Sequence, residues 1–268
     1  MRNAAYMAIP VFVIAAVATV IIENKRAPAA RILPKGAHSY LFPGKVPDSL
    51  ALLPPPPTVN SDAMKRDIAA RDAALKLRGT PRYRLAAADA NRQDRTAMQA
   101  FDCALGVYIG PEQTPTLVRL LASMRIDVRS SAYKAKARYN RPMPYVANHG
   151  TTCLPEAEQL DAGSYPSAGA ALGWAYALVL ARLNPARQEL ILQRGRSFGN
   201  SRLVCDASWE SDVEAGRKVG EEVVKRLLAD RAFEADLAEA RKEVATALSA
   251  GSMPSTRCQD EATTLAMR

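Results

Sequence analysis

The fold is decided by residues 164–185, which read SYPSAGAALGWAYALVLARLNP. A proline–serine turn leads into an alanine-rich apolar segment, and Pro185 ends it, so we expect a helix from Ser167 to Leu183. The segment is apolar on most sides, which predicts a buried helix. Its first backbone N–H groups have no partner within the helix and form a place where an anion can be stabilised.

The rest of the chain also predicts helices. They are expected at 61–77, 94–106, 114–128, 186–199, 212–229 and 232–250. No segment shows sustained period-two alternation, and no glycine-rich phosphate loop of the P-loop or Rossmann type is present. The sequence therefore predicts an all-α, single-domain helical bundle over residues 61–250.

Two segments flank this domain. Residues 30–60 are proline-rich, and Pro54–Pro57 predict a stiff polyproline II segment, which is either an arm packed on the domain or a docking motif. Residues 251–268 form a polar tail that is expected to be loose, apart from Cys258.

The first 29 residues resemble an export signal. Arg2 precedes 19 uncharged, largely apolar residues at 4–22, and small residues follow around Ala29. This pattern predicts a signal peptide cut near Ala29. The run is long enough for a retained anchor in the inner membrane, so both alternatives stay open.

Composition limits the classes of partner. The net charge of +9 favours anionic ligands, whereas the low aromatic content of 6% and the lack of mixed basic and aromatic runs speak against nucleic acid. The chain has four cysteines, Cys103, Cys153, Cys205 and Cys258. In an exported protein an even number of cysteines predicts disulfides, here two, and three pairings stay open. Their spacing and the lack of neighbouring histidines predict no metal site.

Three short segments carry polar groups suited to a phosphate. The first is KAKARYNRP at 134–142, with Lys134 and Arg141 seven residues apart. The second is PSAG at 166–169, and the third is SRLVCDASWESD at 201–212. Taken singly, each is compatible with an ordinary surface stretch or helix start.

Together, and in this order, they resemble the phosphatidic-acid-phosphatase type 2 superfamily, whose pattern is K-x6-RP, then PSGH, then SR-x5-H-x3-D. The sequence around 163–205 is similar to that of the bacterial class A non-specific acid phosphatases, which contain GSYPSGHT followed by a GWA-rich helix. The resemblance covers about residues 50–245. It implies an all-α periplasmic phosphomonoesterase that uses no metal or other cofactor and associates into homo-oligomers.

The resemblance assigns roles residue by residue. One histidine of the family attacks phosphorus, a second protonates the leaving alcohol, and an aspartate, here Asp212, orients the nucleophile. The phosphate-binding positions correspond to Lys134, Arg141, Ser167, Ala168, Gly169 and Arg202. Clustered cations and helix-start amides would stabilise charge on the phosphoryl oxygens.

Three positions depart from the family pattern, and Ala168, which stands where the family has glycine, is the least consequential of them. Gly169 stands where the acid histidine is expected, and Ser208 where the nucleophilic histidine is expected. The chain has only two histidines, His38 and His149, and neither lies in a motif. Because a serine without a base is a poor nucleophile, we expect a pocket that binds a phosphate ester or another small oxyanion with impaired catalysis. Replacing two imidazoles is also expected to leave extra space.

Two alternatives stay open. The first is a working phosphomonoester hydrolase that uses a nucleophile outside the family pattern, such as Ser208 or His149. The second is an envelope interaction or scaffold protein that acts through the proline arm, the N-terminal anchor or the basic helix around 217–226.

Overall fold

The computed structural model describes residues 34–266 apart from 43, 92–93, 160–162 and 252–257. The predicted signal or anchor at 1–29 lies outside the described residues. Residues 31–268 form a compact unit of their own. The described elements are α1 (Ser49–Leu52), α2 (Asp62–Leu75), α3 (Pro81–Ala90), α4 (Asp94–Gln99), α5 (Asp102–Leu105), α6 (Pro115–Tyr139), α7 (Pro144–Ala147), α8 (Glu156–Gln159), α9 (Ala168–Leu183), η1 (Pro185–Arg187), α10 (Gln188–Val204), α11 (Glu210–Leu227), α12 (Arg231–Ser249) and α13 (Cys258–Ala266).

The all-α prediction is confirmed, since the described residues contain helices and no strand. None of these helices is both long and apolar enough to cross a bilayer.

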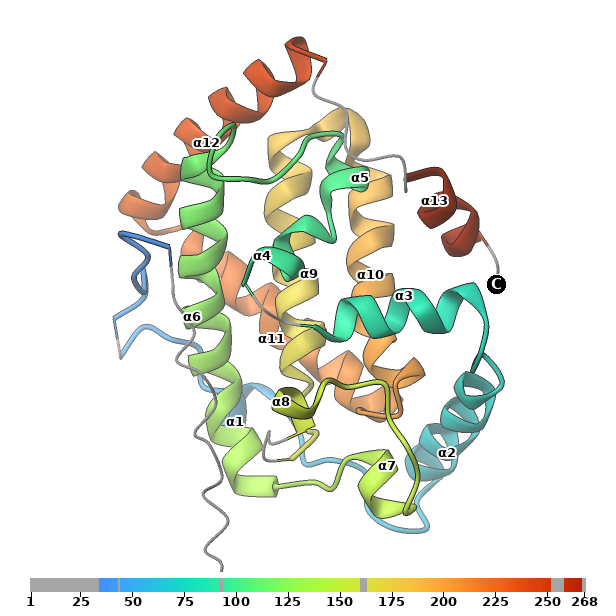
Figure 1. The fold of residues 1–268 in the computed structure, drawn as a ribbon. Helices are drawn as coiled ribbons and strands as arrows, with labels where there is room; N and C mark the ends of the chain where they lie inside the picture. Colours follow the sequence, from blue (N-terminus) through green and yellow to red (C-terminus); the bar gives the residue numbers. More distant parts are fainter. Residues whose placement is uncertain (1–33, 43, 92–93, 160–162, 252–257, 267–268) are drawn as a thin grey trace, which may run out of the picture. The chain divides into compact units, whose positions relative to one another are not determined.

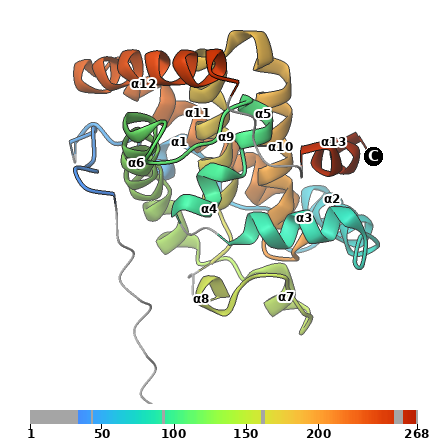
Figure 2. The ribbon, with the colours of Figure 1, turned by 45° about the horizontal axis from the view of Figure 1, so that its top comes forward.

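Helix α9 lies at the centre of the bundle, where α10, α11 and α6 pack around it (Figures 1 and 2). Twelve of its 16 residues are buried, as its apolar sequence predicts. Helix α11 approaches α9 closely because two of its residues are glycines. A Cβ at Gly216 would lie 2.3 Å from the Ser167 carbonyl oxygen, and one at Gly220 would lie 2.4 Å from that of Ala171. This close crossing brings the N-termini of α9 and α11 together.

The structure differs from the predicted helices in several places: α10 continues to Val204 instead of ending at 199, and α3 was not predicted. Helix α6 does not end near residue 128 but continues to Tyr139, where Asn140 caps it with a left-handed backbone (φ 37°). The stretch 129–138 is rich in Ala, Lys and Arg, which are good helix formers, although its polarity had suggested a surface loop. The helix expected at 94–106 is instead two short helices, α4 and α5, which are separated at Phe101 (φ −103°, ψ −1°).

The C-terminal tail is more ordered than the sequence indicated. It contains α13, and a disulfide between Cys103 and Cys258 fastens this helix to α5. A second disulfide joins Cys153 to Cys205. The prediction of two disulfides is thus confirmed, and the structure selects one of the three pairings that the sequence left open.

A buried charge cluster reinforces the attachment of α13. Arg194 of α10 is 1% exposed, and its guanidinium contacts Asp89 of α3 through two hydrogen bonds of 2.5 and 3.1 Å. Its Nε lies 3.2 Å from a carboxylate oxygen of Glu261 in α13. Ser201 also donates to Asp89, at 2.6 Å. A buried guanidinium needs such partners because an uncompensated charge in the core is strongly destabilising.

Asp89→Asn is therefore expected to lower the free energy of unfolding by about 3 kcal/mol, because it removes the main countercharge of a buried arginine while keeping the side-chain shape. Denaturant unfolding measures this change. Asp72→Asn on the exposed side of α2 is the matched control, and its effect is expected to stay within about 0.5 kcal/mol. Equal effects of the two variants would contradict the role given to Asp89.

Candidate active site

The predicted motifs meet at the N-terminus of α9. Ser167 is the N-cap of this helix: its Oγ accepts a hydrogen bond from Ala170 N, and its own N–H donates to the Asp212 carbonyl oxygen at 2.9 Å. The end of α10 supplies Arg202, and the loop between α10 and α11 supplies Ser208. The second and third motifs therefore lie in one place, as the sequence predicted.

A small cavity marks this place. Its lining residues come from the end of α6, the loop that follows it, the start of α9, the end of α10 and the loop that follows α10: they are Lys136, Met143, Gly163, Ser164, Ser167, Ala168, Arg202, Ala207 and Ser208. Among the described residues, this lining holds two cations, Lys136 and Arg202, and three serine hydroxyls. Its volume is about 10 Å³, which is room for one water molecule.

The expected extra space is absent in this conformation. Gly169 lies against the side chain of Arg202, so closely that a Cβ at Gly169 would be 2.8 Å from Arg202 Cδ. Arg202 is buried, with 4% of its surface exposed. The arginine side chain thus occupies space beside the position where the resemblance predicts the acid histidine.

Ser208 is buried and faces a second hydroxyl. Its Oγ donates to Ser167 Oγ at 3.1 Å, and its N–H donates to the Arg202 carbonyl oxygen at 3.1 Å. Asp212, the predicted orienting residue, accepts its hydrogen bonds elsewhere: from Trp209 N at 2.8 Å and from Arg141 Nη1 at 2.6 Å. Burial raises the pKa of Asp212, and the Arg141 guanidinium opposes this shift.

Arg141 lies between two carboxylates instead of in the cavity lining. Its Nη2 donates to Asp67 of α2 at 2.8 Å, while its Nη1 donates to Asp212 and to Ser211 Oγ. The guanidinium carbon is 5.2 Å from the centre of the Trp209 ring. Arg141 therefore joins α2 to the start of α11.

Lys134 also lies outside the cavity lining. Its ammonium forms an ion pair with Asp48 at 2.8 Å, and its side chain is 61% exposed. Because successive residues of a helix are about 100° apart, Lys136 points away from Lys134 and toward the cavity. Lys136 donates to the Gly163 carbonyl oxygen at 2.7 Å. Sequence reasoning missed Lys136, and the signal that could have found it was the continuation of α6 past residue 128.

Of the predicted phosphate-binding residues, Ser167, Ala168 and Arg202 line the cavity, Gly169 adjoins Arg202, and Lys134 and Arg141 are engaged elsewhere. The two histidines, His38 and His149, are both exposed and neither is among the lining residues.

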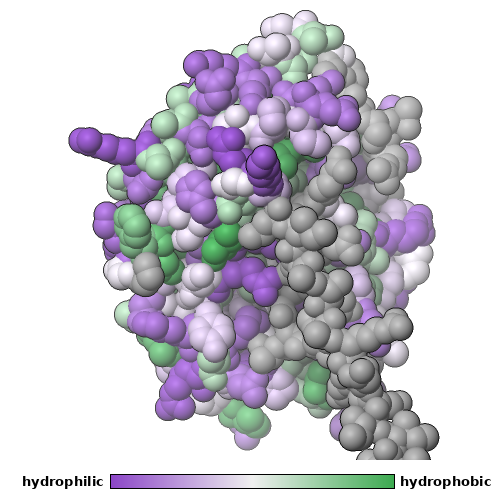
Figure 3. Space-filling model, turned by 60° about the vertical axis from the view of Figure 1, so that its left-hand side comes forward, coloured by the Kyte–Doolittle hydropathy of each residue, from purple (hydrophilic) through white to green (hydrophobic). Residues whose placement is uncertain are grey.

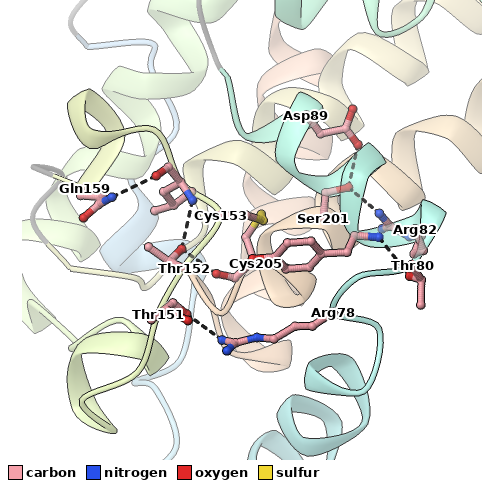
Figure 4. Close-up of a disulfide and its surroundings, with 12 residues drawn as sticks. Arg78, Thr80, Arg82, Asp89, Thr151, Thr152, Cys153, Gln159, Ser201 and Cys205 are labelled. Carbon is pink, nitrogen blue, oxygen red and sulfur yellow. Dashed lines mark hydrogen bonds between the residues drawn. A yellow bond between two sulfur atoms is a disulfide. The ribbon is translucent and has the colours of Figure 1, made fainter.

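Covalent and ionic links fix the segment that carries Arg202 and Ser208. The disulfide of Cys205 with Cys153 joins this segment to the loop before α8, and Thr152 Oγ1 donates to the Cys205 carbonyl oxygen at 2.6 Å (Figure 4). The next residue, Asp206, has a left-handed backbone (φ 58°) and accepts two hydrogen bonds from Arg71, of 2.6 and 2.9 Å.

The proline arm also reaches the site. The Tyr165 hydroxyl, two residues before the N-cap of α9, donates to the Pro54 carbonyl oxygen at 2.6 Å. Burial raises the pKa of Tyr165 to about 12, so the phenol stays protonated at neutral pH and keeps this bond. The arm is thus packed on the domain at this point, which is one of the two alternatives left open by the sequence.

The contact between Gly169 and Arg202 can be tested by adding a methyl group at position 169. Gly169→Ala is expected to lower the free energy of unfolding by about 1–3 kcal/mol, because the new methyl group forces the buried arginine to move. In the Arg202→Ala background the same change is expected to cost less, by at least about 0.5 kcal/mol, since the obstructing side chain is gone.

Gly44→Ala is the matched control, since a Cβ there meets no atom within 4 Å. Additive effects of Gly169→Ala and Arg202→Ala would contradict the packing described.

Comparison with known proteins places the chain in a family, although no family model matches it. It is 39% identical over 209 residues to a non-specific acid phosphatase of Providencia stuartii, a match that covers 77% of this chain and 84% of the relative. It is 36% identical over 195 residues to one of Salmonella typhimurium, covering 72% and 78%. An acid phosphatase of Zymomonas mobilis is 35% identical over 209 residues, covering 77% and 79%. The chain therefore belongs to the non-specific acid phosphatase family.

Proposed function

We propose that this chain is a phosphate-binding member of the acid phosphatase family whose ordinary turnover is impaired. One observation carries the proposal: the cavity holds Ser208 and, beside it, Gly169 at the positions where the resemblance expects histidines, while both histidines of the chain are exposed and outside its lining.

The surroundings of Ser208 offer no base for nucleophilic attack. A serine hydroxyl needs a neighbouring base to attack phosphorus, and the titratable lining residues are Lys136 and Arg202. Lys136 donates a hydrogen bond to the Gly163 carbonyl oxygen. Asp212 accepts hydrogen bonds from Arg141 and Trp209, while the Ser208 hydroxyl donates to Ser167 Oγ.

The charge of the cavity supports anion binding. Two cations and three hydroxyls line it among the described residues, and the N-terminus of α9 adds backbone N–H groups. The cavity has room for about one water molecule, so a bound phosphate needs more space, and movement of the Arg202 side chain away from Gly169 would supply it. Its guanidinium would then meet the anion, for which it offers paired donors.

Export to the periplasm belongs to the same proposal. Two disulfides, with all four cysteines paired, are typical of oxidising compartments. The apolar run at 4–22 supplies an export signal, either cleaved or retained as an anchor. The substrate class, phosphate esters, is taken from the names of the phosphatase relatives.

Binding and turnover can be tested on the same preparation. Inorganic phosphate is expected to bind, as measured by calorimetry and by a rise in thermal stability, and Arg202→Ala is expected to weaken binding at least about tenfold because it removes a charge-assisted hydrogen bond. Arg196→Ala, on the exposed side of the same helix, is the matched control and should bind phosphate like the unmodified chain.

In the same preparation, p-nitrophenyl phosphate is expected to be hydrolysed no faster by the unmodified chain than by Ser208→Ala. Hydrolysis that is lost in Ser208→Ala or in His149→Ala would overturn the impairment and establish the alternative nucleophile. If phosphate does not bind, the proposal that the cavity is a phosphate-binding site is wrong, and the scaffold alternative is favoured.

A further inference from the structure

The proline-rich arm lies along α6 and forms a defined surface with it. Several hydrogen bonds connect the two in the same order along both segments, among them those of His38 with Ser123, Tyr40 with Asp127, Pro47 with Ser131, and Ser49 with Ala135. The arm therefore runs parallel to the helix, and α1 continues it beside the end of α6 (Figure 1). We call the exposed surface of residues 34–52 and 129–139 the arm face.

The arm face exposes large apolar side chains that the core does not use. Phe42 is 70% exposed and Tyr133 is 67% exposed, while Leu50 and Leu52 are 38% and 37% exposed. On this side of the molecule hydrophobic residues form separate areas within a largely hydrophilic surface (Figure 3). Scattered aromatic and aliphatic groups among polar ones suit shallow contact with a lipid interface, where aromatic rings are favoured.

The arm face is also strongly basic. Its exposed cations are Lys35, Lys45, Arg129, Lys134 and Arg138. Among its described residues the single acid is Asp48, which pairs with Lys134. The Lys45 ammonium lies 6.0 Å from the centre of the Phe42 ring, so charge and apolar surface occur side by side. Such a surface is complementary to anionic lipid headgroups, which attract basic residues near the membrane surface.

The sequence connects this face to an apolar segment. The uncharged run at 4–22 precedes the arm by the eleven residues 23–33, which can span at most about 40 Å. If the run is held by a membrane, the arm is the first described part of the chain within reach of the lipid surface, and the tether raises its effective concentration there.

From these observations we propose that the arm face binds an anionic lipid surface. Exposed Phe42 and Tyr133 contact the interface, and the cations around them bind the headgroups. This inference does not depend on the phosphate pocket, because Lys136 and Arg202 take no part in it.

Vesicle binding tests the proposal. The chain from Arg31 onward is suitable, since residues 31–268 form a compact unit of their own and the binding then cannot come from residues 4–22. Cosedimentation with vesicles of phosphatidylcholine and phosphatidylglycerol is expected to exceed that with phosphatidylcholine alone at least about tenfold, and to fall as salt rises.

Lys35→Glu/Lys45→Glu is expected to reduce binding to the anionic vesicles at least about tenfold. Phe42→Ser/Tyr133→Ser is expected to reduce it severalfold, and none of these exposed sites should alter thermal stability. The matched charge control is Lys65→Glu/Lys76→Glu on α2, which lies away from the arm and α6 in both ribbon views (Figures 1 and 2). The matched apolar control is Val59→Ser, at a residue that is 83% exposed.

Three results would overturn the proposal. The first is no binding to the anionic vesicles. The second is an equal loss in the α2 control, which would mean that net charge alone drives adsorption. The third is a chain that does not bind vesicles but self-associates, and that becomes monomeric in Phe42→Ser/Tyr133→Ser. The arm face would then be an interface between two copies.

Discussion

The site depends on one buried interaction, the guanidinium of Arg141 held between the carboxylates of Asp67 and Asp212. It joins α2, the loop after α6 and the first turn of α11, three segments with no local reason to meet. Asp212 in turn accepts from Trp209 N and, through its carbonyl oxygen, from Ser167 N. The start of α9, on which the cavity is built, is therefore positioned through the same network. Breaking one buried partner leaves a charge uncompensated, so the network is held as a unit.

This network has a chemical consequence for the cavity. An arginine neutralised by two carboxylates is a weak ligand for another anion, because its positive charge and its donors are already used. The cavity is lined instead by two other cations, Lys136 and Arg202, which come from the ends of two different helices. The disulfide at Cys205 and the Arg71–Asp206 ion pair hold the backbone beside the cavity in place. Lys136 and Arg202 are long side chains, so a change in the size of the cavity requires only that these side chains move.

Sequence patterns were sufficient for the features set by local chemistry. The apolar run ended by Pro185 predicted α9 to within one residue, and the helix expected at 212–229 matches α11 to within two residues at each end. Patterns were insufficient where the partner is remote. The role of Arg141 depends on Asp67, 74 residues earlier in the chain. The choice between Lys134 and Lys136 depends on where α6 ends and on Asp48, and the order of α13 depends on Cys103 and Arg194.

The two departures from the family motif are linked by packing. Gly169 lies against the Arg202 side chain at the start of α9, and Arg202 and Ser208 both line the cavity, whose volume is about 10 Å³. A histidine at 169 alone would meet the Arg202 side chain, and one at 208 alone would need the space now used by the Ser167–Ser208 contact. Under the proposed correspondence, glycine, serine and the arginine conformation form one self-consistent arrangement. Under this correspondence, a histidine at either position alone is expected to cost stability, because it must displace a side chain that now packs there.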